Sequence, residues 1–146
     1  MDAPQVRGMS LYLDTEFNGF GGRLISMGLV SDVDGEEFYE VLPLPSKVHP
    51  WVNEHVVPFL VKDSVSDHVF DHRLIHFLRK HDAEIIYADW PADFVYLLDR
   101  LYSDNGFMFP VFPCFQLVNS GKLQSAVPHN ALSDARALME WHCVNR

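Results

Sequence analysis

Residues 11–17 have the sequence LYLDTEF, an apolar run that ends in two acids at alternate positions. Residues 10–13 predict a buried strand, and side chains two residues apart in a strand point to the same face. Asp14 and Glu16 are therefore expected to project together, roughly 7 Å apart by the rise of a strand. Two unpaired acids side by side repel each other, but one divalent cation, or a pair about 4 Å apart, can bridge that spacing.

The rest of the chain predicts a mixed α/β fold. A second β-rich run covers residues 24–33, Asp34 and Gly35 supply a hairpin turn, and residues 37–42 form the returning strand. Apolar spacing and proline positions then predict helices and strands in alternation. These are helices at 51–60, 65–79, 91–102 and 132–144, and strands at 84–88 and 114–118. An antiparallel β-meander followed by parallel strands and flanking helices is expected, as one domain over residues 1–146.

Composition argues against several classes of protein. Hydrophobic residues make up 48% of the chain, so disorder is not expected. The apolar runs are too short, or too broken by proline, to cross a bilayer, and the first residues lack the pattern of a signal peptide. A cytoplasmic protein with no membrane partner is expected. Cys114 and Cys143 are not in a CxxC spacing and indicate neither a zinc knuckle nor a disulfide framework.

The net charge limits the kind of nucleic-acid partner. A formal charge of −9 disfavours a long duplex track, because phosphate binding usually needs a basic surface. Bound cations would reverse the local charge of an acidic site, and four carboxylates with two divalent ions would be about neutral. A footprint of a few nucleotides at one chain end is therefore expected.

Two further acids stand at the start of predicted helices. Asp93 follows the 84–88 strand, where an acid also stabilises the helix dipole by about 0.3–1 kcal/mol. Asp134 opens the last helix, where capping would also explain it. His129 lies in the loop before that helix and has no such local role. An accessible imidazole can accept a proton from water at neutral pH.

In order and spacing, these residues resemble the DEDDh 3′–5′ exonucleases, an RNase H-like superfamily, over nearly the whole chain. The resemblance implies an RNase H-like mixed sheet and two Mg²⁺ or Mn²⁺ ions held by four carboxylates, with His129 as the base. The carboxylates are those of Asp14, Glu16, Asp93 and Asp134. Asp89 stands four positions before Asp93, where the family commonly has Asn, so Asp89 could assist or replace Asp93. Asp93 is preferred because the apolar residues 94–98 follow it, as in the family.

A closer resemblance is to the RNase AS and RNase T-like exoribonucleases, through residues 14–17, 24–30, 34–35 and 51–58. It implies a homodimer that removes nucleoside 5′-monophosphates from the 3′ ends of single-stranded RNA, in the RNase AS group with a preference for adenylate tails. The backbone around Thr15 and Phe17 would hold the terminal sugar, with Phe17 against the last base. A 3′–5′ exodeoxyribonuclease of the repair or proofreading type, and a non-catalytic nucleic-acid-binding relative, remain alternatives.

Aromatic and histidine clusters give weaker indications. Trp90 beside Asp93 would either stack on a base or pack in the core. A second group fits core or dimer contact better than a base-binding strip: Phe107, Phe109, Phe112 and Phe115. Three histidines recur at four-residue spacing, which can bind zinc, but no catalytic Glu lies between them. A solvated helix face is the preferred interpretation of His68, His72 and His76.

Overall fold

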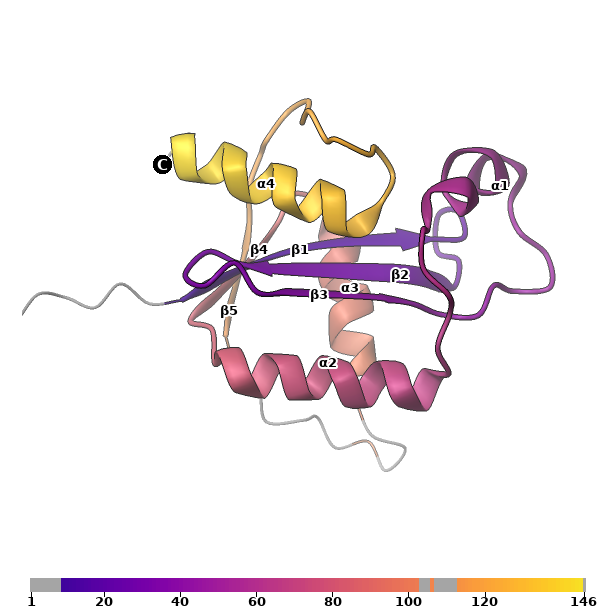
Figure 1. The fold of residues 1–146 in the computed structure, drawn as a ribbon, viewed down its shortest axis with the longest axis horizontal. Coiled ribbons are helices and arrows are strands. Elements are labelled where there is room, and N and C mark those ends of the chain that lie inside the picture. The colour runs from indigo at the N-terminus through magenta and orange to yellow at the C-terminus, as the bar shows by residue number, and fades with distance from the viewer. Residues whose placement is uncertain (1–8, 103–105, 107–112, 146) are drawn as a thin grey trace, which may run out of the picture.

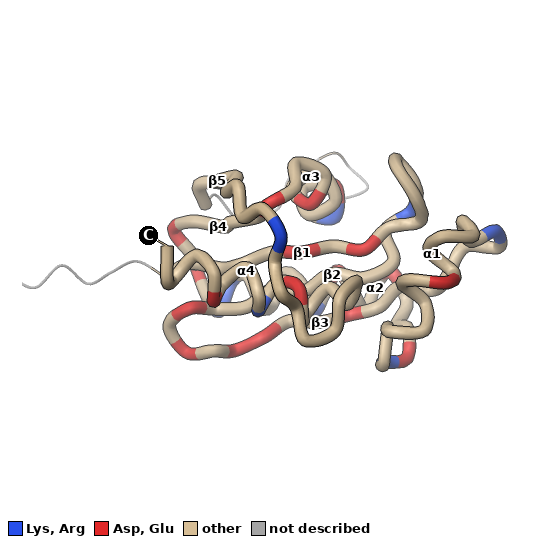
Figure 2. The backbone as a smooth tube through the Cα atoms, turned by 90° about the horizontal axis from the view of Figure 1, so that it is seen from above, with Lys and Arg blue, Asp and Glu red and all other residues tan. Residues whose placement is uncertain are grey.

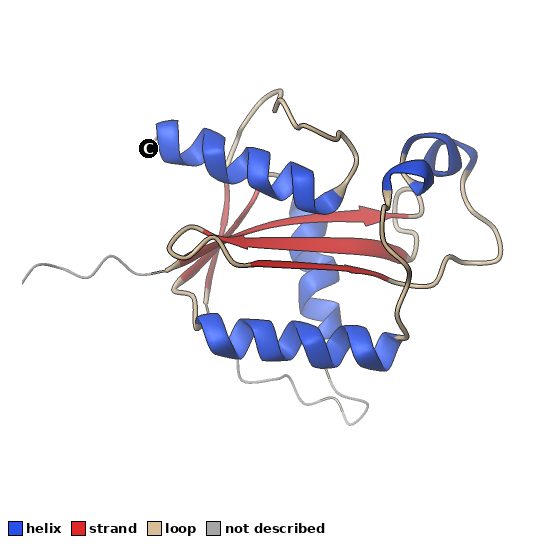
Figure 3. Ribbon diagram, viewed as in Figure 1, coloured by secondary structure: helices blue, strands red, loops and turns tan. Residues whose placement is uncertain are grey.

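A computed structural model describes residues 9–102, 106 and 113–145 of the chain. The strands are β1 (Ser10–Phe17), β2 (Leu24–Ser31), β3 (Glu37–Val41), β4 (Ile85–Ala88) and β5 (Cys114–Leu117). The helices are α1 (Pro50–His55), the 3₁₀ helix η1 (Val57–Phe59), α2 (Asp67–His81), α3 (Pro91–Arg100) and α4 (Ala131–Asn145). Figure 3 shows these helices packed around the strands. The predicted order of elements is confirmed.

The strands form one mixed sheet in the order β3-β2-β1-β4-β5. β1 and β2 are antiparallel, as are β2 and β3, whereas β4 runs parallel to β1 and β5 runs parallel to β4. This arrangement confirms the predicted meander followed by parallel strands. β1 and β4 are neighbours in the centre of the sheet, so their carboxyl ends point to the same edge.

Helices cover both faces of the sheet (Figure 1). α4 packs on β1 and β2 on one face, and α2 and α3 cover the other. Side chains alternate along β1, so successive residues face the helices on opposite sides of the sheet. Leu11 and Leu13 belong to the core beneath α2 and α3, while Tyr12 packs with Leu138 of α4. Asp14 and Glu16 continue the Tyr12 series, which places them on the α4 side, as the two-residue period predicts.

Several predicted boundaries were wrong. α2 begins and ends two residues later than the expected 65–79, and α3 ends at Arg100 instead of residue 102. The single helix expected over residues 51–60 is divided into α1 and η1, because Pro58 has no N–H to donate to the preceding helical turn. β2 ends at Ser31, two residues early, because Ser31 closes the hairpin by accepting from Gly35 and donating to Glu36. Phe107, Phe109 and Phe112 lie outside the described residues, so their expected role as core or dimer contacts is not tested.

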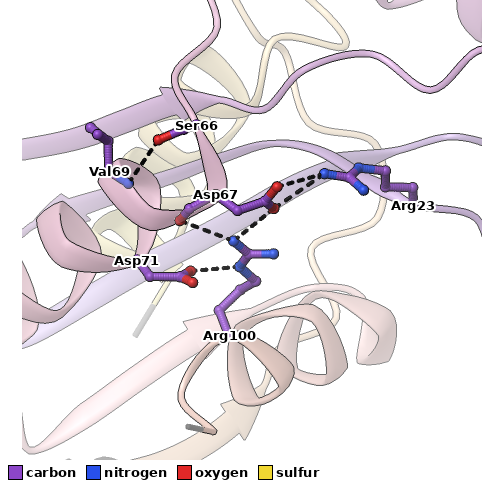
Figure 4. Close-up of polar contacts among 6 residues, drawn as sticks. All are labelled: Arg23, Ser66, Asp67, Val69, Asp71 and Arg100. Atoms are coloured by element: carbon purple, nitrogen blue, oxygen red, sulfur yellow. Dashed lines mark hydrogen bonds and ion pairs between the residues drawn. The ribbon is translucent and has the colours of Figure 1, made fainter. Parts of the chain in front are cut away.

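An ion-pair network fixes the far end of α3 against α2 (Figure 4). Arg100 donates to Asp71 over 2.7 Å and to Asp67 over 3.1 Å, and Asp67 also accepts from Arg23 of the β1–β2 loop over 3.0 Å. Ser66 caps α2 by accepting from the Val69 N–H. Exposed pairs of this kind contribute about 0–1 kcal/mol each. These ion pairs matter for position more than for stability, because they hold α3 against α2 and α3 carries Asp93 in its first turn.

Among the described residues, no helix combines the length and apolar character needed to cross a membrane.

Candidate metal centre

The site lies where β1 extends beyond its parallel neighbour. β4 pairs only with residues 10–12 of β1 and ends at Ala88, whereas β1 continues to Phe17. The turn at Asp89 and the first turn of α3 follow at once, so they lie beside the second half of β1. Figure 2 shows acidic positions on both β1 and the neighbouring α3. Ligand sites of open α/β sheets commonly form at such carboxyl ends of strands.

Gly28 brings the last helix to the same place. It pairs with Asp14 across the β1–β2 ladder. A Cβ atom at this position would lie 2.7 Å from the backbone of Ala131 and Leu132, a distance that no side chain tolerates. The start of α4 therefore rests directly on the sheet beside Asp14. Asn130 caps α4 by accepting from the Ser133 N–H over 3.0 Å.

Gly28→Ala is expected to displace α4 from the sheet and to lower stability by about 1–3 kcal/mol, the usual cost of overpacking. Thermal unfolding measures this loss. Ser26→Ala is the control, because it lies on the same strand, removes a buried hydroxyl that has no partner, and adds no atom. A Gly28→Ala protein that melts with the Ser26→Ala control would contradict the close approach of α4.

Five carboxylates from three distant segments form two overlapping groups. Asp14, Glu16 and Asp134 make up one, and Asp14, Asp89 and Asp93 make up the other. In each group, one oxygen from every residue lies within 4.8 Å of the others. Asp14 belongs to both groups. The structure therefore brings together the four carboxylates predicted from the sequence, and it places Asp89 in the same group as Asp93.

Two oxygens in these carboxylate groups are buried without a hydrogen-bond partner, Oδ2 of Asp14 and Oδ2 of Asp93. Asp93 is only 1% exposed, and its other oxygen accepts from the Thr15 hydroxyl over 2.6 Å. A buried carboxylate oxygen with no partner is costly. Divalent cations remove that cost, and carboxylate oxygens are the ligands that Mg²⁺ and Mn²⁺ prefer. The donor set therefore fits the expected ions.

The carboxyl groups hold protons more tightly than free carboxyls. Burial raises the pKa of Asp14 well above its ordinary range, and the four neighbouring carboxylates raise it further. Burial also raises the pKa of Glu16 to about 9, with Asp134 and Asp93 adding to the effect. The pKa of Asp93 is raised to about 7, again mainly by burial, although the Thr15 hydrogen bonds oppose the rise. Bound cations would replace these protons.

His129 lines the same cavity as Asp14, Asp89 and Asp134. Its backbone N–H donates to Oδ2 of Asp134 over 3.2 Å, and its φ of +65° directs the chain sharply into α4. The Trp51 ring meets the imidazole edge-on, with ring centroids 5.1 Å apart. No pattern in the sequence indicated this contact, because the 43–49 loop that leads into α1 has no regular spacing of apolar residues.

An aromatic pocket of about 360 Å³ adjoins the carboxylates at Glu16. Phe17, Trp51 and Trp90 line it, and Phe17 stacks on Tyr96 of α3 with centroids 4.8 Å apart. Trp90 is 54% exposed, so the alternative in which it packs in the core is wrong. The Thr15 side chain is buried and bonded to Asp93. The side chain is therefore already engaged, and the expected role of the Thr15 backbone stays a prediction.

The helix-face histidines lie away from this site. His68, His72 and His76 are exposed on α2, and among the described residues none of the three belongs to a group of potential metal ligands. His81 at the end of α2 does lie within 3.3 Å of Asp34 and 3.2 Å of Glu36. Lys80 also pairs with Glu36, and Asp34, Glu36 and His81 form a separate group of potential ligands at the far end of α2.

Phe115 is partly exposed on β5 and packs edge-to-face against Phe94 of α3, with centroids 5.3 Å apart.

No protein-family model matches the chain, and no curated protein matches it.

Proposed function

We propose that the chain is a metal-dependent 3′–5′ exonuclease of the RNase H-like DEDDh type that removes nucleoside 5′-monophosphates from single-stranded RNA. The observation that carries the proposal is the pair of three-carboxylate groups that share Asp14, with buried oxygens on Asp14 and Asp93 that have no protein partner. Two adjacent cations on shared carboxylates suit phosphodiester hydrolysis.

Two Mg²⁺ or Mn²⁺ ions, when bound, would position and acidify the attacking water and stabilise charge on the leaving oxygen. His129 accepts the proton of that water, since this residue lines the same cavity as Asp14 and Asp134. The water oxygen bonds to phosphorus, and the bond from phosphorus to the 3′-oxygen of the preceding nucleotide breaks. That oxygen takes a proton from solvent and becomes the new 3′-hydroxyl, while the released nucleotide carries a 5′-phosphate.

The aromatic pocket supports a substrate with unstacked bases. Phe17 and the exposed indoles of Trp51 and Trp90 border it next to Glu16. Stacking on aromatic side chains contributes about 1–3 kcal/mol for each base and tolerates any base. A single-stranded 3′ end can present its last base to this pocket, whereas a base inside a duplex cannot. A few such contacts agree with the acidic composition of the chain.

Digestion of 5′-labelled single-stranded RNA and matched DNA with Mg²⁺, followed by mass spectrometry, tests the proposal. The expected result is RNA shortened stepwise from its 3′ end, with release of nucleoside 5′-monophosphates. Faster digestion of DNA would favour the exodeoxyribonuclease alternative. RNA that is bound but stays intact would favour the non-catalytic relative and overturn the proposal.

A homodimer, expected from the resemblance, is part of the proposal. All four residues of β5 are exposed at the edge of the sheet, and Phe115 and Leu117 add apolar surface there. An exposed apolar edge strand is a common place for a second chain to pack. Light scattering is expected to give twice the chain mass, and a stable monomer would refute the dimer without affecting the catalytic proposal.

A further inference from the structure

The pocket contains one more carboxylate than the four expected metal ligands. Asp89 lies in the turn between β4 and α3, and its side chain lines the cavity together with Asp14, His129 and Asp134. At this position the sequence resemblance leads one to expect a neutral Asn. A fifth negative charge beside Asp14 and Asp93 worsens their repulsion, so it needs a physical explanation.

Asp89 is held in place by the segment that follows β5. Its Oδ2 accepts a hydrogen bond of 3.0 Å from the hydroxyl of Ser120, which is itself buried. The backbone bond of 2.9 Å from the Val118 N–H to the Ala88 carbonyl ties the end of β5 to the residue before Asp89. The side chain is therefore fixed toward the cavity instead of turning to solvent, where a lone carboxylate would be better solvated.

Asp89 completes a three-carboxylate group that does not depend on Glu16 or Asp134. One oxygen each from Asp14, Asp89 and Asp93 lies within 4.8 Å of the others. The second observation is Asp93, which is 1% exposed and has an Oδ2 without a hydrogen-bond partner. A buried oxygen of that kind beside two more carboxylates is a place for a hard cation, which takes oxygen ligands and completes its shell with water.

We infer that Asp89 is a ligand of the second divalent cation, and that the protein binds both cations before any RNA arrives. The inference rests on the proposed function, since it concerns the same pocket. Each cation has three protein carboxylates, with Asp14 bridging the two. The second ion therefore does not need a substrate phosphate to complete its ligand set. An Asn at position 89 would keep one oxygen but remove the charge that attracts the cation.

Titration of the metal-free chain with Mn²⁺, without RNA, tests the inference. Calorimetry gives the number of ions bound and their affinities, and electron paramagnetic resonance detects coupling between two ions on one shared carboxylate. The wild-type chain is expected to bind two coupled Mn²⁺ ions. Asp89→Asn is expected to raise the dissociation constant of the second ion at least about tenfold and to abolish the coupling. Removing even a residue that only hydrogen-bonds to a metal ligand weakens metal binding by about that factor.

Asp99→Asn is the matched control. Asp99 is an exposed residue of the same helix as Asp93, and this variant loses the same charge while keeping both ions. Thermal melting establishes that the Asp89→Asn protein is folded. Two coupled ions in Asp89→Asn with wild-type affinities would overturn the inference, as would a wild-type chain that binds fewer than two. A wild-type chain that binds two ions but leaves RNA intact would instead overturn the proposed function and leave the inference standing.

Discussion

Asp14→Asn is expected to lower the rate of RNA digestion by roughly a thousandfold. Asp14 is the only residue common to both carboxylate groups, so its loss weakens both cation positions at once. Cations contribute several kcal/mol of charge stabilisation in the transition state, and about 4 kcal/mol corresponds to a factor of roughly a thousand in rate. Single-turnover digestion of labelled RNA with saturating Mg²⁺ measures the change.

The same substitution is expected to raise the melting temperature of the metal-free protein. The Asn side chain has the same shape but cannot ionise, so folding no longer has to neutralise a carboxylate whose charge burial and four neighbouring carboxylates disfavour. Each kcal/mol relieved corresponds to about 3 °C for a chain of this size. Asp63→Asn, at an exposed loop position, controls for net charge and should change neither measurement. Wild-type digestion by the Asp14→Asn variant would show that the pocket is not the reaction site.

The order of the elements along the chain and the faces of β1 were predictable from local pattern. Asp14 and Glu16 share a face because side chains alternate along a strand, and the hairpin at Gly35 set the antiparallel start. Predicting that Asp93 and Asp134 lie beside these two residues required the order of the strands in the sheet. Parallel strands after the meander were expected from the alternation of strands and helices, but the pairing of β4 with β1 was not predicted, because nothing local in either strand specifies its neighbour.

Other parts of the site depend on contacts that leave little trace in a single sequence. Asp89 lies beside Asp14 because β4 ends just before Asp89 while β1 continues. The sequence around Asp89 does not indicate where β4 ends relative to β1. Gly28 looked like one more residue in a β-rich run, yet it admits the α4 backbone. Trp51 reaches His129 through a loop without periodicity. In each case tertiary packing, not local preference, determines the contact.

Stability of the metal-free protein is expected to fall as pH rises from about 5 to about 9. Unfolded carboxyls release their protons near pH 4, whereas the folded pKa is raised to about 7 at Asp93 and to about 9 at Glu16. Over this window the folded chain binds more protons than the unfolded chain, so each increase in pH favours unfolding. Melting curves in a chelator, across this pH range, measure the decline.

Mg²⁺ or Mn²⁺ is expected to reverse this decline, and to do so more strongly at about pH 8 than at about pH 5. Cations and protons compete for the same carboxylate oxygens, so metal binding strengthens as the protons leave. A cation at a hundredfold excess over its dissociation constant stabilises the folded chain by about 2.7 kcal/mol, or roughly 5–10 °C in melting temperature.

Sodium chloride at equal ionic strength is the control, because screening alone would weaken the repulsion without occupying a site. Equal protection by both salts, or equal protection by Mg²⁺ at both pH values, would mean that the carboxylates of the pocket do not hold cations. A stabilisation by Mg²⁺ that grows with pH and is lost in Asp14→Asn would show that the buried carboxylates bind the cations, because that variant removes the carboxylate that both ions need.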